Sequence, residues 1–150
     1  MEYAHELSET KDMPQLDTIF GVPEGQDARV LADLAREKMA KDSVIVHVAL
    51  DDARCESLHD ALTFFAPDVE IVRFPAWDCL PYDRVSPSAD IVAQRVSALC
   101  IFLGWQSTKV RKPRIVLTTV NAALQKVMPQ EALENASLNF VRGGRVSEDN

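Results

Sequence analysis

The chain has 150 residues, of which 47% are hydrophobic and 26% charged, and a formal net charge of −7. This composition is ordinary for a globular protein, and the length suffices for one domain with its own core. The acidic excess argues against direct binding to nucleic acid, which depends on lysine and arginine side chains that neutralise phosphates. No stretch approaches the ~20 consecutive apolar residues of a membrane span, so no membrane partner is expected.

The cysteines and histidines predict neither disulfides nor a metal site. The three cysteines are odd in number and lie far apart without a C-x-x-C spacing, which is typical of a reducing compartment. His47 lies in an apolar run, where a packed role is the ordinary one, and we expect no carboxylate or cysteine ligands near His5 or His59. Residues 1–20 contain five acidic residues and no apolar run, so they are not a secretory signal. We therefore expect a cytoplasmic protein.

The first fifty residues predict a polar segment, a helix and a strand. Residues 1–18 are polar and are expected to be loosely ordered or to form a short helix at most. Residues 21–28 occupy the place of a phosphate-binding loop before an amphipathic helix. The apolar positions with helical spacing are Leu31, Leu34, Ala35 and Met39. The β-branched run 43–50 predicts a strand that is covered on both faces, as in parallel sheets.

The middle of the chain predicts a helix, a strand and a shaped loop. Asp51 and Asp52 offer an N-cap for a helix that ends at Pro67. Its apolar face is predicted to contain Cys55, Leu58, Leu62 and Phe65. Residues 69–74 predict a second strand. In the following loop, prolines at positions 75, 81 and 87 stiffen the backbone, and the large side chains of Trp77, Leu80 and Tyr82 need cover from water.

The last third predicts a helix and a third strand. Asp90 is predicted to cap a helix that ends at Gly104, with an apolar stripe formed by Val92, Val96, Leu99 and Leu103. We interpret the basic segment 105–113 as a solvated turn. Residues 114–119 predict a buried strand, residues 129–135 a brief helical or irregular link, and residues 138–142 an alternating strand. Strands that alternate with helices imply a three-layer α/β fold, a parallel sheet with helices on both faces.

Residues 77–99 carry a far more specific pattern than the rest of the chain. They read W-D-C-L-P-Y-D-R-V-S-P-S-A-D-I-V-A-Q-R-V-S-A-L. This run resembles, without a gap, the signature W-E-T-L-P-Y-D-x-x-S-P-x-x-D-I-x-x-x-R-L-x-x-L near the amino terminus of the bacterial transcription-repair coupling factors, the Mfd family. The matching residues are Trp77, Leu80, Pro81, Tyr82, Asp83, Ser86, Pro87, Asp90, Ile91, Arg95 and Leu99. The run T-T-V-N-A-A-L-Q-K-V-M-P at residues 118–129 also resembles a V-x-T-L-x-Q-x-x-P segment of that family.

The resemblance implies a nucleotide-binding fold that has lost its site. This part of the family is similar to domain 1a of the excinuclease subunit UvrB, a P-loop NTPase fold, but lacks its ATPase activity. Alignment with the UvrB loop G-V-x-G-x-G-K-T keeps Gly21 but places Asp27 at the lysine and Ala28 at the hydroxyl position. That lysine would reach the phosphates and that hydroxyl would hold Mg²⁺. The loop, represented by Gly21, Gly25, Asp27 and Ala28, is therefore predicted to be vestigial, and no cofactor is expected to bind this chain.

The resemblance assigns no catalytic residue within the chain. We expect Trp77, Leu80 and Tyr82 to anchor the loop onto the sheet edge. The carboxylates of the loop are expected to act as caps, as turn formers or as partners of Arg84 and Arg95. These carboxylates are Asp78, Asp83 and Asp90.

The resemblance further implies an amino-terminal, non-catalytic fragment of a coupling factor, a protein that displaces stalled RNA polymerase at DNA lesions and recruits UvrA for nucleotide excision repair. We expect a polar segment at 1–18, a UvrB-like domain at 19–136, and at 137–150 the start of a truncated second domain of the UvrA-recruiting type. ATP and Mg²⁺ would belong to a downstream motor. The fragment would act as a scaffold, or as an autoinhibitory or recruitment surface toward the other domains.

Two alternatives stay open at this point. The first is an active UvrB-like, ATP-binding repair helicase subunit, against which stand the missing lysine and hydroxyl of the phosphate loop. The interval between residues 74 and 90 is also too short for a DNA-clamping β-hairpin like that of UvrB. The second is an unrelated nucleotide-binding or regulatory α/β domain, since a fold alone does not imply a function.

Overall fold

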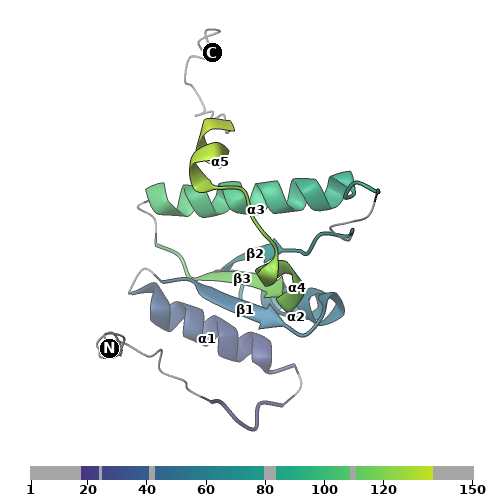
Figure 1. Cartoon of the computed structure of the whole chain (residues 1–150). Helices are drawn as coiled ribbons and strands as arrows, with labels where there is room; N and C mark the ends of the chain where they lie inside the picture. Colours follow the sequence, from purple (N-terminus) through teal and green to yellow (C-terminus); the bar gives the residue numbers. More distant parts are fainter. Residues whose placement is uncertain (1–17, 24, 41–42, 80–83, 109–110, 137–150) are drawn as a thin grey trace, which may run out of the picture.

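Three short strands form one parallel sheet with a central third strand (Figure 1). The computed structural model describes residues 18–23, 25–40, 43–79, 84–108 and 111–136. The strands are β1 (Ile45–Ala49), β2 (Glu70–Phe74) and β3 (Arg114–Thr119), in the order β1-β3-β2. The prediction of a parallel α/β sheet is confirmed, and the strands lie within two residues of their predicted bounds. The predicted strand at 138–142 and the proposed second domain lie outside the described residues.

The helices cover the two faces of the sheet unequally. They are α1 (Asp27–Met39), α2 (Asp52–Phe65), α3 (Ala89–Ser107), α4 (Val120–Leu124) and α5 (Gln130–Ala136). The connection from β1 to β2 and the connection from β2 back to β3 cross the sheet in opposite directions, so right-handed crossovers place α2 and α3 on opposite faces. Figure 1 shows α3 on one side of the sheet and α1 on the other. We call the face under α1 and α2 the closed face, and the face under α3 the open face.

The closed face holds the better-filled core. Small residues of α1, namely Ala28, Ala32 and Ala35, let this helix lie close to Ile115 and Leu117 of β3. Cys55, Leu58 and Leu62 of α2 complete the cluster, and Asp51 caps this helix by accepting a hydrogen bond from the amide of Arg54, as predicted. The predicted helix faces were partly wrong. Leu31 of α1 is only partly buried, at the border of the closed-face core. Phe65, in the last turn of α2, is 66% exposed.

The open face is covered over β2 and β3 but not over β1. Residues Val46, Val116 and Val72 lie side by side across the three strands. Val116 and Val72 are buried, whereas Val46 is 61% exposed, and Val48 of the same strand is 47% exposed. The prediction that the first strand is covered on both faces is therefore wrong, because α3 packs over β2 and its side chains reach β3 at Val116 but leave Val46 and Val48 exposed.

Helix α3 differs from its prediction at both ends and in its orientation. The N-cap is Ser88, whose hydroxyl accepts a hydrogen bond from the amide of Ile91, and Asp90 lies in the first turn instead. The helix continues past Gly104 to Ser107. Its buried face contains Arg95 and Ala98, while Val92 and Val96 of the predicted stripe are partly exposed.

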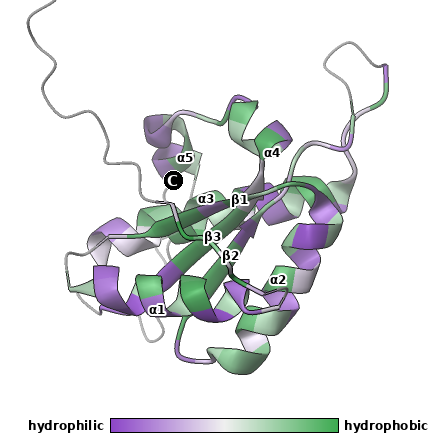
Figure 2. Cartoon of the chain, turned by 90° about the horizontal axis from the view of Figure 1, so that it is seen from below, coloured by the Kyte–Doolittle hydropathy of each residue, from purple (hydrophilic) through white to green (hydrophobic). Residues whose placement is uncertain are grey.

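The hydropathy of the strands and helices agrees with a sheet that lies between helices. In Figure 2 the strands are mostly hydrophobic, and the surrounding helices carry hydrophilic residues as well. Within the described residues, none of the helices combines the length and the apolar character that a bilayer crossing requires.

Candidate functional site: the signature loop and its anchor

The residues that carry the specific sequence pattern meet at the carboxyl end of the sheet. The loop after β2, residues 75–88, is called here the signature loop, and it leads into α3. Helix α4 follows directly after β3, the neighbour of β2. Loops that follow adjacent parallel strands lie at one edge of the sheet, which is where α/β proteins usually form sites. The signature loop and the end of α4 are therefore brought together by the topology.

Arg95 is the centre of this region. The residue is only 2% exposed, and its guanidinium carbon lies 4.3 Å from the centroid of the Phe74 ring and 4.3 Å from that of the Trp77 ring. Its Nη1 donates a hydrogen bond to the backbone carbonyl of Pro75. Burial lowers the pKa of the Arg95 guanidinium, but an arginine stays charged at neutral pH. The favourable stacking of a cation on two rings offsets part of the cost of burying it.

Gln125, at the end of α4, connects Arg95 to the signature loop. Its side-chain Oε1 accepts a hydrogen bond of 2.8 Å from the amide of Trp77 and another of 3.3 Å from Nη1 of Arg95. One amide oxygen thus joins the segment 77–99 to the segment 118–129. We call the group Phe74, Trp77, Arg95 and Gln125 the loop anchor.

The sequence reasoning missed Phe74 and Gln125 as members of this group. A signal for Gln125 existed, because its segment and the signature loop follow two consecutive predicted strands and both resemble one family. Of the carboxylates that were expected to pair with Arg84 or Arg95, the described Asp78 and Asp90 do not contact Arg95, and Asp83 lies outside the described residues. Within the described residues the contacts of Arg95 are two rings and two amide oxygens.

The remaining signature residues have local roles or lie outside the described residues. Asp78 accepts hydrogen bonds from the amide of Ser88 at 3.1 and 3.2 Å, which close the loop. Hydrogen bonding to the side chain of Ser88, and then to its amide, holds the pKa of the Asp78 carboxyl below the usual value. This agrees with the expected turn-forming role. Ser86 and Asp90 are exposed, and Pro87 is half-buried. Leu80, Pro81, Tyr82 and Asp83 lie outside the described residues, so the proposed anchoring by Leu80 and Tyr82 stays a prediction.

The segment that was predicted to be a vestigial phosphate loop lies at the start of α1. Gly21 and Gly25 have φ values of 71° and 85°, the left-handed region that favours glycine. Asp27, at the position of the lysine, forms an ion pair with Arg54 and accepts a hydrogen bond from the amide of Ala28. Ala28 is buried in the core of the closed face. The two positions that the predicted alignment assigns to the phosphate-binding lysine and to the Mg²⁺-binding hydroxyl are thus used for an ion pair between α1 and α2 and for packing.

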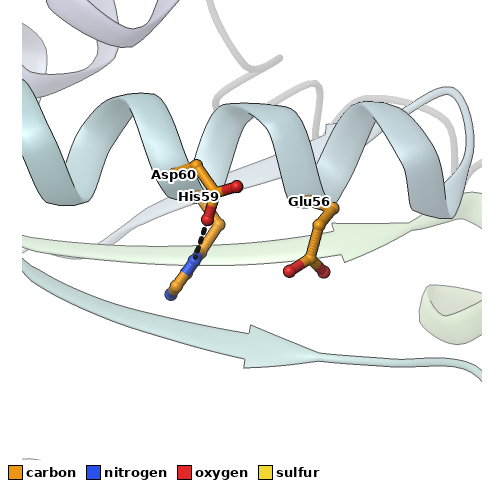
Figure 3. Close-up of side chains that lie close together, drawn as sticks. All are labelled: Glu56, His59 and Asp60. Atoms are coloured by element: carbon orange, nitrogen blue, oxygen red, sulfur yellow. Dashed lines mark ion pairs between the residues drawn. The ribbon is translucent and has the colours of Figure 1, made fainter.

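One cluster of potential metal ligands lies on α2. Glu56, His59 and Asp60 each place a ligand atom within 4.8 Å of the others, and Nδ1 of His59 lies 3.5 Å from the Asp60 carboxylate (Figure 3). The expectation that His59 has no nearby carboxylate is wrong, because one turn of helix brings Glu56 alongside it. Glu56 already forms an ion pair with Arg73 of β2, so a cation would have to compete with a guanidinium.

The chemistry available at the loop anchor is recognition and positioning. Arginine and glutamine supply donors and an acceptor, but within the described residues no cysteine, histidine or carboxylate lies among their contacts to act as nucleophile or base. The anchor instead fixes the signature loop against β2, α3 and α4.

Comparison with known proteins identifies what the chain is similar to. It is 30% identical over 105 residues to the transcription-repair-coupling factor of Escherichia coli K12, which covers 70% of this chain. It is 40% identical over 104 residues to that of Myxococcus xanthus and 26% identical over 125 residues to that of Haemophilus influenzae. These matches span 8%, 8% and 10% of the relatives' own lengths. No family model and no solved structure matches the chain. The four matching relatives all carry one name and cover 57–83% of this sequence, and the chain is therefore related to a region of the transcription-repair-coupling factors.

Proposed function

We propose that this chain is the amino-terminal, UvrB-like and non-catalytic part of a coupling factor that displaces stalled RNA polymerase and recruits UvrA for nucleotide excision repair. The observation that supports the proposal is the loop anchor. Arg95, Trp77 and Gln125 come from the two segments that resemble the family, and they join these segments by hydrogen bonds and ring stacking instead of forming a reactive site. The relatives are about ten times longer than the matched region, so the motor and the polymerase contact would lie elsewhere in the polypeptide.

A titration with MgATP separates this scaffold from the alternative of an ATP-binding helicase subunit. Asp27 places a negative charge where a lysine would meet the triphosphate, and Ala28 cannot hold Mg²⁺. Calorimetry of the full chain with MgATP is expected to show no binding at micromolar concentration. Micromolar binding would overturn the non-catalytic assignment and favour the UvrB-like enzyme.

Detection and immunoprecipitation of the native polypeptide test the proposed coupling role. An antibody raised against this chain is expected to detect, in the source cells, a protein many times heavier than the 16.7 kDa of these residues. Immunoprecipitation of that protein after DNA damage is expected to recover UvrA and RNA polymerase, identified by mass spectrometry. Recovery of neither partner would contradict the proposal, whatever the mass of the polypeptide.

A further inference from the structure

The first strand forms an edge of the sheet that is suited to pairing. Within the described residues β1 pairs with β3 alone, so the backbone N–H and C=O groups along its other side have no strand beside them. Edge strands of natural proteins often carry a charge or a proline, which prevents pairing with another chain, but β1 reads I-V-H-V-A and contains neither. Its two valines, Val46 and Val48, are 61% and 47% exposed on the open face. This edge can therefore receive another strand.

Strand β1 is complementary to a second copy of itself in the antiparallel direction. With a two-fold axis through His47, perpendicular to the sheet, all five residues of β1 are paired, and the open faces of both copies point to the same side. Val46 then lies opposite Val48 of the second copy on the open face, and Ile45 lies opposite Ala49 on the other face. Burial lowers the pKa of His47 below the usual 6.5, so the two imidazoles that meet at the axis are mostly uncharged at pH 7.

The two ends of β1 carry opposite charges. At the amino-terminal end, Nη1 of Arg111 donates a hydrogen bond to the backbone carbonyl of Ala40, at the end of α1, and the neighbouring Lys112 is exposed. At the carboxyl-terminal end, Asp51 and Asp52 stand at the start of α2 and are exposed. Antiparallel pairing brings the basic end of each copy beside the acidic end of the other. Charge complementarity thus favours this contact, although each chain has a net charge of −7.

We propose that β1 is a self-association edge, at which two copies of this chain pair through antiparallel β1 strands and join their three-stranded sheets into one. The pairing also unites the exposed valines of both copies in one apolar strip on the open face. A contact built on one five-residue strand belongs to the smallest class of interfaces, below about 1,200 Å² in total, so the dimer is weak and forms at high protein concentration. The inference does not depend on the proposed role in repair.

Sedimentation equilibrium of the full chain tests the proposal. From low micromolar to submillimolar protein, the average mass is expected to rise from 16.7 kDa toward twice that value. Val46→Lys places a charge in the middle of the edge and is expected to keep the chain monomeric over the same range. Phe64→Lys, at an exposed ring of α2, is the matched control and should associate like the wild type. Circular dichroism verifies that both variants are folded.

Three outcomes of this experiment would overturn the proposal. The first is a wild type that stays monomeric at every concentration. The second is association that survives Val46→Lys, and the third is association that Phe64→Lys abolishes equally, because in both cases the contact would lie elsewhere on the chain.

A charge exchange tests the antiparallel direction at positions that are exposed in the monomer. Lys112→Glu and Asp52→Lys are each expected to weaken the dimer about fivefold or more, since the two-fold axis repeats the lost ion pair. The two substitutions in one chain restore opposite charges across the contact and should return the dissociation constant to within about twofold of the wild type. A double variant that associates as weakly as either single variant would overturn the antiparallel pairing.

Discussion

The two faces of the sheet are built by different physical means. The closed face is a conventional core in which alanines of α1 and leucines of α2 interlock with Ile115 and Leu117. The open face is organised around a buried arginine between two rings, and its apolar surface over β1 is uncovered. The difference teaches that the closed face supplies most of the buried apolar core, whereas the open face positions Trp77 of the signature loop and leaves the valines of β1 exposed.

The strongest test of this contrast compares one apolar truncation on each face. Leu62→Ala removes a fully buried side chain from the closed face and is expected to reduce the free energy of unfolding by about 3 kcal/mol. Val46→Ala, on the exposed strand β1 of the open face, should reduce the free energy of unfolding by less than about 1 kcal/mol. Urea denaturation of both variants measures the difference. Equal losses would show that β1 is covered on both faces in solution.

The buried arginine gives the next largest effect. Arg95→Met keeps the apolar stem and removes the guanidinium, and the loss of ring stacking and of two hydrogen bonds is expected to cost about 1–3 kcal/mol. Arg95→Lys keeps the charge but not the planar fork, and it should recover little of this loss. Thermal unfolding followed by tryptophan fluorescence is the measurement. An Arg95→Met variant with unchanged stability and an unchanged fluorescence of Trp77 would contradict this expectation. It would show that the loop anchor depends on apolar packing alone.

Coupling within the loop anchor gives a smaller effect. Gln125→Leu removes the acceptor that Trp77 and Arg95 share and is expected to cost about 1 kcal/mol. In a double-mutant cycle with Arg95→Met, the two losses should not add, because both variants break the same hydrogen bond. Additive losses would mean that α4 and α3 hold the signature loop independently.

This contrast also explains how far the sequence could predict the structure. The strands and the closed face follow from β-branched runs and apolar periodicity, and β3, buried along its whole length, was placed at its observed bounds. The orientation of α3 was missed because periodicity counts an arginine as an outward residue, so Val92 and Val96 were taken for the buried stripe. Only the positions of Phe74 and Trp77 in space make burial of Arg95 favourable, and no local pattern contains that information. Gln125 was missed although its segment resembles the same family, because its hydrogen-bond partners lie 30 and 48 residues away in the sequence.

The smallest predicted effect is a pH dependence that belongs to the closed face alone. His47 of β1 lies on the same face of the strand as Ile45 and Ala49 of the closed-face core. Burial lowers the pKa of His47 below the usual 6.5, Asp27 opposes this decrease, and Arg54 adds to it. The folded state therefore binds this proton less readily than the unfolded chain does. Stability from the neutral imidazole is fully present above about pH 6.5 and declines as the pH falls toward the lower, folded-state pKa.

Chemical denaturation at several pH values measures this decline. His47→Gln removes the titrating group, so its free energy of unfolding should change less than that of the wild type between pH 7.5 and pH 5.5. The Arg95 variants should follow the wild-type curve at a constant offset, because a guanidinium does not titrate in this range. A wild type that gains stability on acidification would reverse the assignment. It would show that the charged imidazole pairs with Asp27 in the fold, and that the closed face also depends on a buried cation.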